Sequence, residues 1–172
     1  IESKGVLVLL DALKILKEQG YYFACDFVGS ETAEIPTSRF QQEAKARGLV
    51  EQTIFHGKKL GSEKEVYLRN ADIFTLPSNN EAFPLVNLEA MQHKLPIVTT
   101  NVGGIPDVVK DGINGLIVEV QGGKVKPEQL AEKIAILLNN EALRLQMGET
   151  GYLLYDNYFT LHKFEQRITP CL

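Results

Sequence analysis

The sequence has 172 residues, enough for one domain, and its 44% of hydrophobic residues can supply a full core. The formal net charge of −4, with no block of basic residues, gives no support for nucleic-acid binding. No stretch reaches the roughly 20 apolar residues that a membrane span needs. The widely separated Cys25 and Cys171 favour a reducing compartment.

Helices and strands are predicted to alternate along the chain. Helical spacing of apolar residues, with turn residues between the segments, predicts helices over 5–19, 35–48, 62–70, 84–93, 127–139, 142–155 and 161–168. Short apolar runs predict strands over 21–28, 52–56, 71–76, 96–100 and 116–118. This alternation predicts an α/β fold, a Rossmann-like parallel sheet with helices on both faces.

Two of these helices carry more detailed expectations. Ser62 is predicted to cap its helix, with Glu65 three residues later, as in a capping box. Gly148 and Gly151 weaken the prediction of a helix over 142–155, because glycine is a poor helix former.

The chain is organised around residues 76–107, which read as strand, loop, helix, strand, loop and the start of a helix. Pro84 fits the first turn of the helix, because its fixed φ suits that position and it has no N–H to lose. We expect this helix to bury one apolar face that carries Leu85, Leu88 and Met91.

Two carboxylates accompany this helix, Glu81 before its start and Glu89 inside it. Both can face a crevice at the carboxyl end of a buried strand, where open α/β sheets place ligands. Free amides and the helix dipole favour a phosphate there, and a carboxylate can hold two vicinal hydroxyls, so a nucleotide sugar fits. Alternatively, Glu81 is a loop charge and Glu89 a solvated helical residue, since glutamate is common near helix starts. The residues alone leave both interpretations open.

Residues 81–91, EAFPLVNLEAM, resemble the E-x7-E motif of retaining GT-B glycosyltransferases. The resemblance is to the large family that contains sucrose synthase and bacterial mannosyl- and N-acetylglucosaminyltransferases. It continues through PIVTT at 96–100, GGIPD at 103–107 and DGING at 111–115. It implies the C-terminal donor-binding lobe of a GT-B fold, and transfer of a sugar from a nucleotide-diphospho-sugar with retention and without metal or cofactor.

The resemblance also implies roles for three charged residues. Glu89 would hold the nucleotide ribose, and Glu81 would hold hydroxyls of the donor sugar. Lys4 and Gly5 match a K-G pair that contacts the donor diphosphate in the family, so Lys4 and Glu81 are the predicted catalytic residues. Without the resemblance, Lys4 reads as a solvated lysine, although a lysine at a helix start opposes the helix dipole.

By the same resemblance, the phosphate and sugar of the donor lie against Phe83, Pro84, Leu85 and Val86. Pro84 stands where glycine is frequent in the family, and proline donates no N–H. We therefore expect the amides of Leu85 and Val86 to donate to the phosphate. Core packing is a competing role for Phe83.

Gly29, His56 and Gly57 complete the predicted donor site, at the ends of two strands that face the same crevice. Glycine there lets a ligand approach the backbone. Capping or packing is an equally good role for His56. His93 and His162 have no acid or thiol at metal-ligand spacing, so no metal site is assigned.

Residues 1–172 are expected to form one C-terminal lobe that lacks its first strand and an N-terminal acceptor lobe. Because the sequence does not begin with Met, we interpret Ile1 as lying inside a longer protein. The implied partners are a nucleotide-sugar donor and, through the other lobe, an acceptor sugar or lipid-linked sugar. The implied location of the full-length protein is cytoplasmic or peripheral at the membrane.

Two other classes of protein remain open. A GT-B nucleotide-sugar 2-epimerase is compatible with the segment GGIP at 103–106, although the E-x7-E motif with Phe-Pro argues against it. A non-enzymatic flavodoxin-like binding module would need an acidic cluster at the carboxyl ends of its first and third strands, and the sequence has none there.

Overall fold

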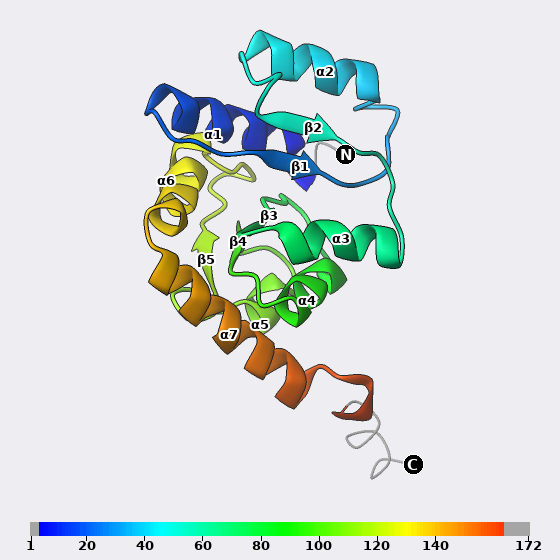
Figure 1. The fold of residues 1–172 in the computed structure, drawn as a ribbon, viewed down its shortest axis with the longest axis vertical. Helices are drawn as coiled ribbons and strands as arrows, with labels where there is room; N and C mark the ends of the chain where they lie inside the picture. Colours follow the sequence, from blue (N-terminus) through cyan, green and yellow to red (C-terminus); the bar gives the residue numbers. More distant parts are fainter. Residues whose placement is uncertain (1–3, 164–172) are drawn as a thin grey trace.

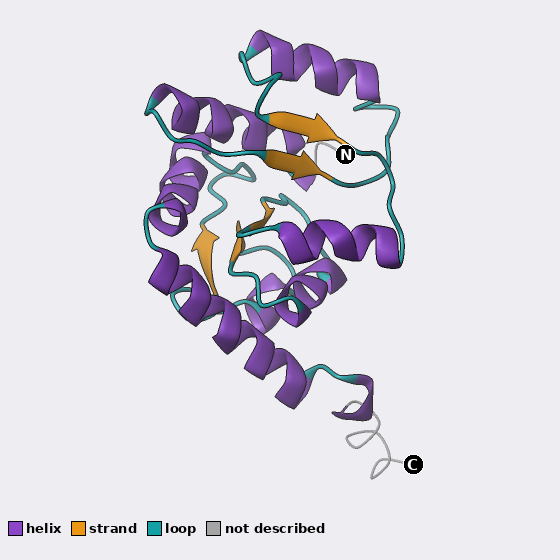
Figure 2. Cartoon of the chain, viewed as in Figure 1, coloured by secondary structure: helices purple, strands orange, loops and turns teal. Residues whose placement is uncertain are grey.

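The computed structural model describes residues 4–163 and has parallel strands with helices packed on both sides (Figures 1 and 2). The helices are α1 (Val6–Glu18), α2 (Thr37–Ala46), α3 (Ser62–Asn70), α4 (Leu85–Gln92), α5 (Ile105–Val108), α6 (Pro127–Leu138) and α7 (Glu141–Tyr158). The strands are β1 (Cys25–Phe27), β2 (Thr53–Phe55), β3 (Phe74–Leu76), β4 (Ile97–Thr100) and β5 (Gly115–Val118). The predicted α/β class is confirmed.

The strands form two parallel groups, β1 with β2 and the set β3-β4-β5. In the second group Phe74 lies opposite Ile97, and Thr100 lies opposite Val118. Between residues 4 and 163, β1 and β3 do not pair with each other, so the expected sheet is divided at this point.

The side chains of β4 point alternately into two apolar cores, as successive residues of a strand must. Val98 belongs to the core under α1 and α6, and Ile97 to the core under α4 and α5. All four residues of β4 are buried. A strand that is covered on both faces reads as a continuous apolar or small-residue run, which is why PIVTT could be predicted.

Most predicted elements are confirmed, but their boundaries move. The strand predicted over 21–28 is reduced to β1, because Tyr22 is 99% exposed outside the sheet. Of the helix predicted over 161–168, residues 161–163 are helical and the rest lies outside the described residues. The capping role of Ser62 is wrong: α3 already begins at Ser62, and Gly61 occupies the N-cap position with no side-chain cap.

The predicted buried face of α4 is also wrong in part. The helix buries Asn87, Ala90 and Met91, whereas Leu85 is 66% exposed. Residues three and four apart share a helix face, so the phase set by Asn87 and Met91 turns Leu85 outward. Glu89, one turn after Leu85, is turned outward with it.

α7 is longer than the predicted 142–155, and its glycines face α4. Asn140 caps the helix through its side-chain oxygen, which accepts the Leu143 N–H at 2.9 Å. A Cβ at Gly148 would lie 1.9 Å from the carbonyl oxygen of Lys94, the residue that ends the turn after α4. The glycines that weaken the sequence prediction therefore allow the two helices to approach.

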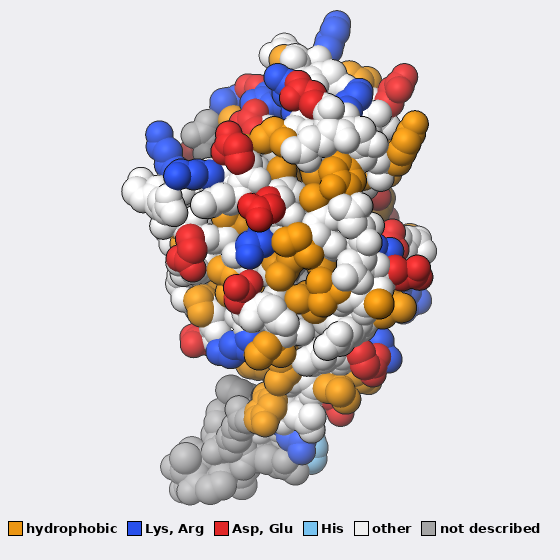
Figure 3. All heavy atoms as spheres, turned by 90° about the vertical axis from the view of Figure 1, so that its left-hand side faces the viewer, with side chains coloured by type: hydrophobic (Ala, Val, Ile, Leu, Met, Phe, Trp, Pro, Cys, Tyr) orange, Lys and Arg blue, Asp and Glu red, His pale blue; other side chains and the backbone are white. Residues whose placement is uncertain are grey.

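On the face shown in Figure 3, acidic and basic side chains are interspersed with apolar ones. Across residues 4–163, no helix combines the length and the apolar character needed to cross a membrane.

Candidate functional site

The two residues predicted as catalytic meet in the structure. The Lys4 ammonium, just before α1, pairs with the Glu81 carboxylate in the loop after β3, although 77 positions separate them. The Glu81 side chain is 13% exposed and that of Lys4 is 38% exposed. The pair lies at the carboxyl end of β3, where parallel sheets place ligands. The contact is a structural fact, and the catalytic roles of the two residues remain predictions.

Close backbone packing fixes this pair in place. Gly5, at φ 76°, precedes α1, and a Cβ there would lie 2.0 Å from the Pro77 carbonyl oxygen. A Cβ at Gly103 would lie 1.5 Å from the Glu81 carbonyl oxygen, and the Gly104 N–H donates to the Ala82 carbonyl at 3.1 Å. Three chain segments therefore meet around Glu81 at distances that only glycine allows.

The entry to α4 differs from the expected pair of free amides. Pro84 lies at φ −87° and ψ 74°, the geometry of an inverse γ-turn. The Leu85 N–H accordingly donates to the Phe83 carbonyl at 3.1 Å and is already committed. The Val86 N–H has no acceptor among residues 4–163. Phe83 is 45% exposed, so its side chain is not a core residue. Val86 is thus the better placed of the two predicted phosphate donors.

Glu89 has its own lysine partner. Its Oε1 accepts a hydrogen bond from Lys64 Nζ of α3 at 2.6 Å, and the two side chains are 34% and 29% exposed. Glu81 and Glu89 therefore each face an ammonium group, one from the segment before α1 and one from α3.

The remaining predicted residues lie at the ends of β1 and β2. The Gly29 N–H donates to the Gly57 carbonyl at 3.0 Å, which joins the two loops. His56 Nε2 lies 2.6 Å from Asp26 Oδ1, and its ring packs on that of Tyr67 with centroids 4.6 Å apart. The structure thus shows the packing role considered for His56, while contact with a nucleobase remains a prediction.

The thiol of Cys25, the first residue of β1, is chemically quiet. Burial, with a smaller contribution from the Asp26 charge, raises the pKa of the Cys25 thiol to about 12, so Cys25 is no nucleophile at neutral pH. Within residues 4–163, no group of three or more His, Cys, Asp or Glu side chains is arranged to hold a metal ion.

Lys64, Tyr67 and Asp26 were missed by sequence reasoning. Asp26 could have been found, because it lies in a predicted strand close to its carboxyl end. The sequence does not indicate a role for Lys64, because a lysine in the first turn of a polar helix is ordinarily solvated. Its partner, Glu89, lies 25 positions away along the chain.

Two hollows in the surface lie away from these residues. One of about 370 Å³ is lined by Phe40, Ala44 and Ile54 beside β2, and one of about 390 Å³ by Val108 and Leu154 among others. Neither includes a residue of the segment 81–89.

Behind the outward face of α4, one buried amide lacks partners. Asn87 is fully buried, and neither its Oδ1 nor its Nδ2 has a hydrogen-bond partner among the described residues. Asn114 is equally buried, but its Oδ1 accepts the Lys110 N–H at 2.7 Å and its Nδ2 donates to Val108 O at 3.1 Å.

These two asparagines should respond oppositely to replacement by leucine. Asn87→Leu is expected to raise the free energy of unfolding by about 1–2 kcal/mol, because it removes a desolvated and unpaired amide. Asn114→Leu is expected to lower it by a similar or larger amount, because it leaves the Lys110 N–H and the Val108 carbonyl unpaired. Urea denaturation of both variants measures this, and a loss of stability in Asn87→Leu as large as in Asn114→Leu contradicts it.

The fold and the site define a class of protein. Two lysine–glutamate pairs lie near the carboxyl edge of the parallel strands, beside the N-terminus of α4, which is where open α/β folds bind their ligands. The family model of glycosyl transferases group 1 matches residues 1–154. The chain therefore belongs to the glycosyl transferases group 1.

Similar proteins agree with this assignment. The capsular polysaccharide biosynthesis glycosyltransferase CapM of Staphylococcus aureus is 31% identical over 160 residues, which cover 93% of this chain and 40% of that protein. A glycosyltransferase structure from Rickettsia africae superposes with a TM-score of 0.85 at 26% identity, over 98% of this chain and 44% of that one. Anabaena HepE, solved with UDP-glucose, has a TM-score of 0.86 at 21% identity over 99% and 45% of the two chains.

The neighbours confirm the fold as that of the C-terminal lobe of a GT-B glycosyltransferase. The matches cover between 18% and 42% of the length of similar curated glycosyltransferases.

Proposed function

We propose that this chain is the donor-binding lobe of a retaining glycosyltransferase that transfers a sugar from a nucleotide-diphospho-sugar to an acceptor. The observation that carries the proposal is the ion pair of Lys4 and Glu81 beside the N-terminus of α4. In this proposal, the pair supplies a cation and a carboxylate for sugar hydroxyls close to a helix N-terminus, whose dipole favours a phosphate. Relatives named for polysaccharide biosynthesis and a neighbour solved with UDP-glucose support the same substrate class.

Each residue has a distinct role in this proposal. The Lys4 ammonium and the Val86 N–H stabilise the negative charge that develops on the diphosphate as its bond to the anomeric carbon breaks. Glu81 accepts hydrogen bonds from hydroxyls of the donor sugar, and Glu89 accepts them from the ribose. Because Lys4 and α4 supply the positive charge, the reaction needs no metal ion. The acceptor oxygen then bonds to the anomeric carbon on the face that the diphosphate leaves, and the proton of the acceptor hydroxyl passes to the departing diphosphate.

The proposed lobe is one part of a two-lobed enzyme. In doubly wound sheets, the strand before the first helix lies at the centre of the sheet. Among residues 4–163, β1 pairs only with β2 and β3 only with β4, so each strand leaves one edge at which such a strand preceding α1 would fit. The acceptor, a sugar or lipid-linked sugar, would bind to a preceding N-terminal lobe. We place the whole enzyme in the cytoplasm or at the membrane surface.

Calorimetric titration of the chain with UDP, GDP and ADP tests the donor site. One nucleotide should bind saturably, and Glu89→Ala should weaken it about 10- to 100-fold, the cost of losing charge-assisted hydrogen bonds to two hydroxyls. Glu128→Ala, which removes an acidic residue from the first turn of α6, is the matched control and should leave binding unchanged. Failure of all three nucleotides to bind at millimolar concentration contradicts the proposal for this lobe.

The same titration separates the two glutamates. Glu81→Gln should weaken the nucleotide sugar about tenfold more than the nucleotide diphosphate, because Glu81 is assigned to the sugar and its partner Lys4 to the diphosphate. Equal losses for both ligands would contradict that assignment.

The isolated chain is expected to show no sugar transfer. Measurable turnover, with or without a chelator, would contradict the need for a second lobe.

A further inference from the structure

Lys64 of α3 forms an ion pair with the Glu89 carboxylate of α4. Lys64 is the third residue of α3, and its Nζ donates to Glu89 Oε1 at 2.6 Å. The two side chains are partly buried, at 29% and 34% exposure, so this pair is less screened than a fully exposed one. α3 is thereby joined to α4 at the position where Glu89 faces outward.

α3 lies between the β1-β2 pair and α4 (Figure 1). Tyr67, one turn after Lys64, packs on His56, which is hydrogen-bonded to Asp26 of β1. Residues three apart on a helix are neighbours, so Lys64 and Tyr67 lie side by side. The ion pair with Glu89 and the packing of Tyr67 on His56 therefore come from neighbouring positions of α3.

The ion pair limits the freedom of Glu89. A glutamate on an exposed helix face loses conformational entropy when a ligand orders it, and a partner that orders it beforehand removes that cost from binding. Lys64 engages Oε1, and within residues 4–163 the second oxygen, Oε2, has no hydrogen-bond partner. An ionised carboxylate bound at one oxygen keeps its capacity to accept hydrogen bonds at the other.

We propose that Lys64 is a positioning residue: it fixes the ionised Glu89 carboxylate so that Oε2 accepts hydrogen bonds from the ribose hydroxyls of the donor. This inference rests on the proposed function, in which Glu89 holds the ribose. Lys64 acts through Glu89 and is assigned no contact with the ligand.

The test compares ribonucleotides with analogues that lack the ribose hydroxyls. The wild-type chain, Lys64→Met and Lys64→Arg are titrated with UDP, GDP and ADP and with the 2′,3′-dideoxy form of each. Lys64→Met should weaken binding of the preferred ribonucleotide about tenfold and binding of its dideoxy form less than about twofold. The difference is expected because Lys64 is coupled to the ribose hydroxyls through Glu89, and the dideoxy form lacks them. Lys64→Arg should restore most of the loss. A merely structural role would weaken both forms alike, and that result overturns the inference.

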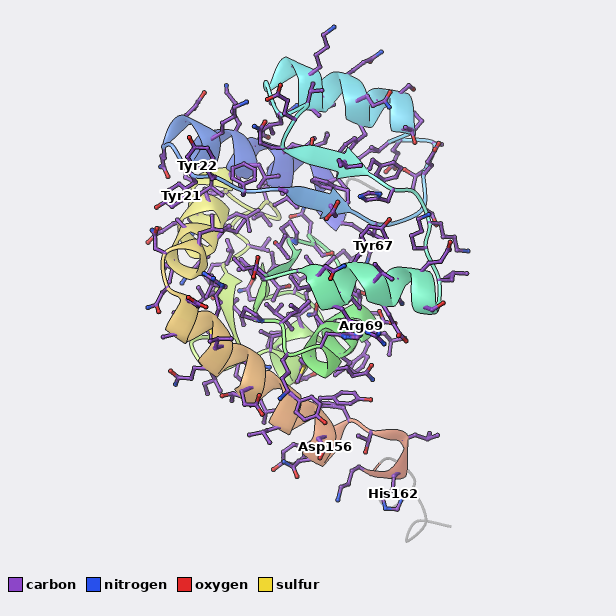
Figure 4. All side chains as sticks on the ribbon, in the orientation of Figure 1. Tyr21, Tyr22, Tyr67, Arg69, Asp156 and His162 are labelled. Atoms are coloured by element: carbon purple, nitrogen blue, oxygen red, sulfur yellow. The ribbon has the colours of Figure 1, made fainter. Side chains whose placement is uncertain are left out.

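Arg69→Met is the matched control. Arg69 lies on the same helix, pairs with Glu65 at 2.9 Å, and is on the other side of α3 from Tyr67 (Figure 4). The variant removes one positive charge and one ion pair from α3, as Lys64→Met does. It should leave both ligands unaffected, and a loss equal to that of Lys64→Met would overturn the inference.

Glu89→Gln in the same series separates this inference from the proposed function. If Glu89→Gln abolishes the preference for ribose and Lys64→Met preserves it, Glu89 holds the ribose without help from Lys64, and the inference alone fails. If Glu89→Gln preserves the preference, the ribose role of Glu89 is wrong and the inference fails with it.

Discussion

Gly103→Ala is expected to lower the free energy of unfolding by about 3 kcal/mol and to weaken donor binding. Gly103 lies at φ 53°, and its Cβ would come 1.5 Å from the Glu81 carbonyl oxygen, far inside van der Waals contact. Backbone must move to relieve this overlap, and forced shifts in well-packed regions cost about 1–3 kcal/mol in addition to the strain of a positive φ. The segment that moves carries Glu81, so its pairing with Lys4 should be lost as well.

Gly112→Ala provides the control for backbone strain. Gly112 also has a positive φ, 74°, but no atom lies within 4 Å of the position that its Cβ would take. It should cost only the positive-φ strain, about 1–2 kcal/mol, and leave donor binding unchanged. Urea denaturation and nucleotide-sugar titration of both variants measure the difference. If the two variants are equally stable and bind equally well, close packing against Glu81 is not what requires glycine at 103.

The fold could be predicted because its regularities are local. Alternating apolar runs and turn residues locate the helices and strands, and the buried PIVTT run marks a central strand. The phase of α4 could not be predicted in the same way. Its apolar residues lie all around the helix, so a polar residue, Asn87, had to be identified as buried. A pattern of hydrophobic residues does not predict that an amide side chain is buried.

The site could be predicted only in part. Their place beside a helix start makes Glu81 and Glu89 candidates, and the resemblance favours them over the solvated alternative and adds Lys4. The contact of Lys4 with Glu81 depends on how three loops pack, which spacing along the chain does not encode. The Leu85 N–H donates to the Phe83 carbonyl because of the turn at Pro84. The conformation of that turn depends on the backbone before and after Pro84.

Gly148→Ala is expected to destabilise the protein by about 3 kcal/mol, although alanine is the better helix former by about 1 kcal/mol. Its Cβ would lie 1.9 Å from the Lys94 carbonyl oxygen. Lys94 cannot retreat easily, because it holds a left-handed conformation at φ 57° and its N–H donates to the Met91 carbonyl at 3.0 Å to close the end of α4. The overlap therefore forces α7 away from α4.

Gly151→Ala, one turn along the same face of α7, separates packing from helix propensity. Its Cβ would lie 3.5 Å from Met91 Cγ, an ordinary contact, so the variant should gain up to about 1 kcal/mol from propensity. Thermal and urea denaturation should show a lower free energy of unfolding for Gly148→Ala and a higher one for Gly151→Ala. Two stabilised variants would show that α7 does not press on the end of α4. In that case, α4 would present Glu89 without support from α7 on its inner side.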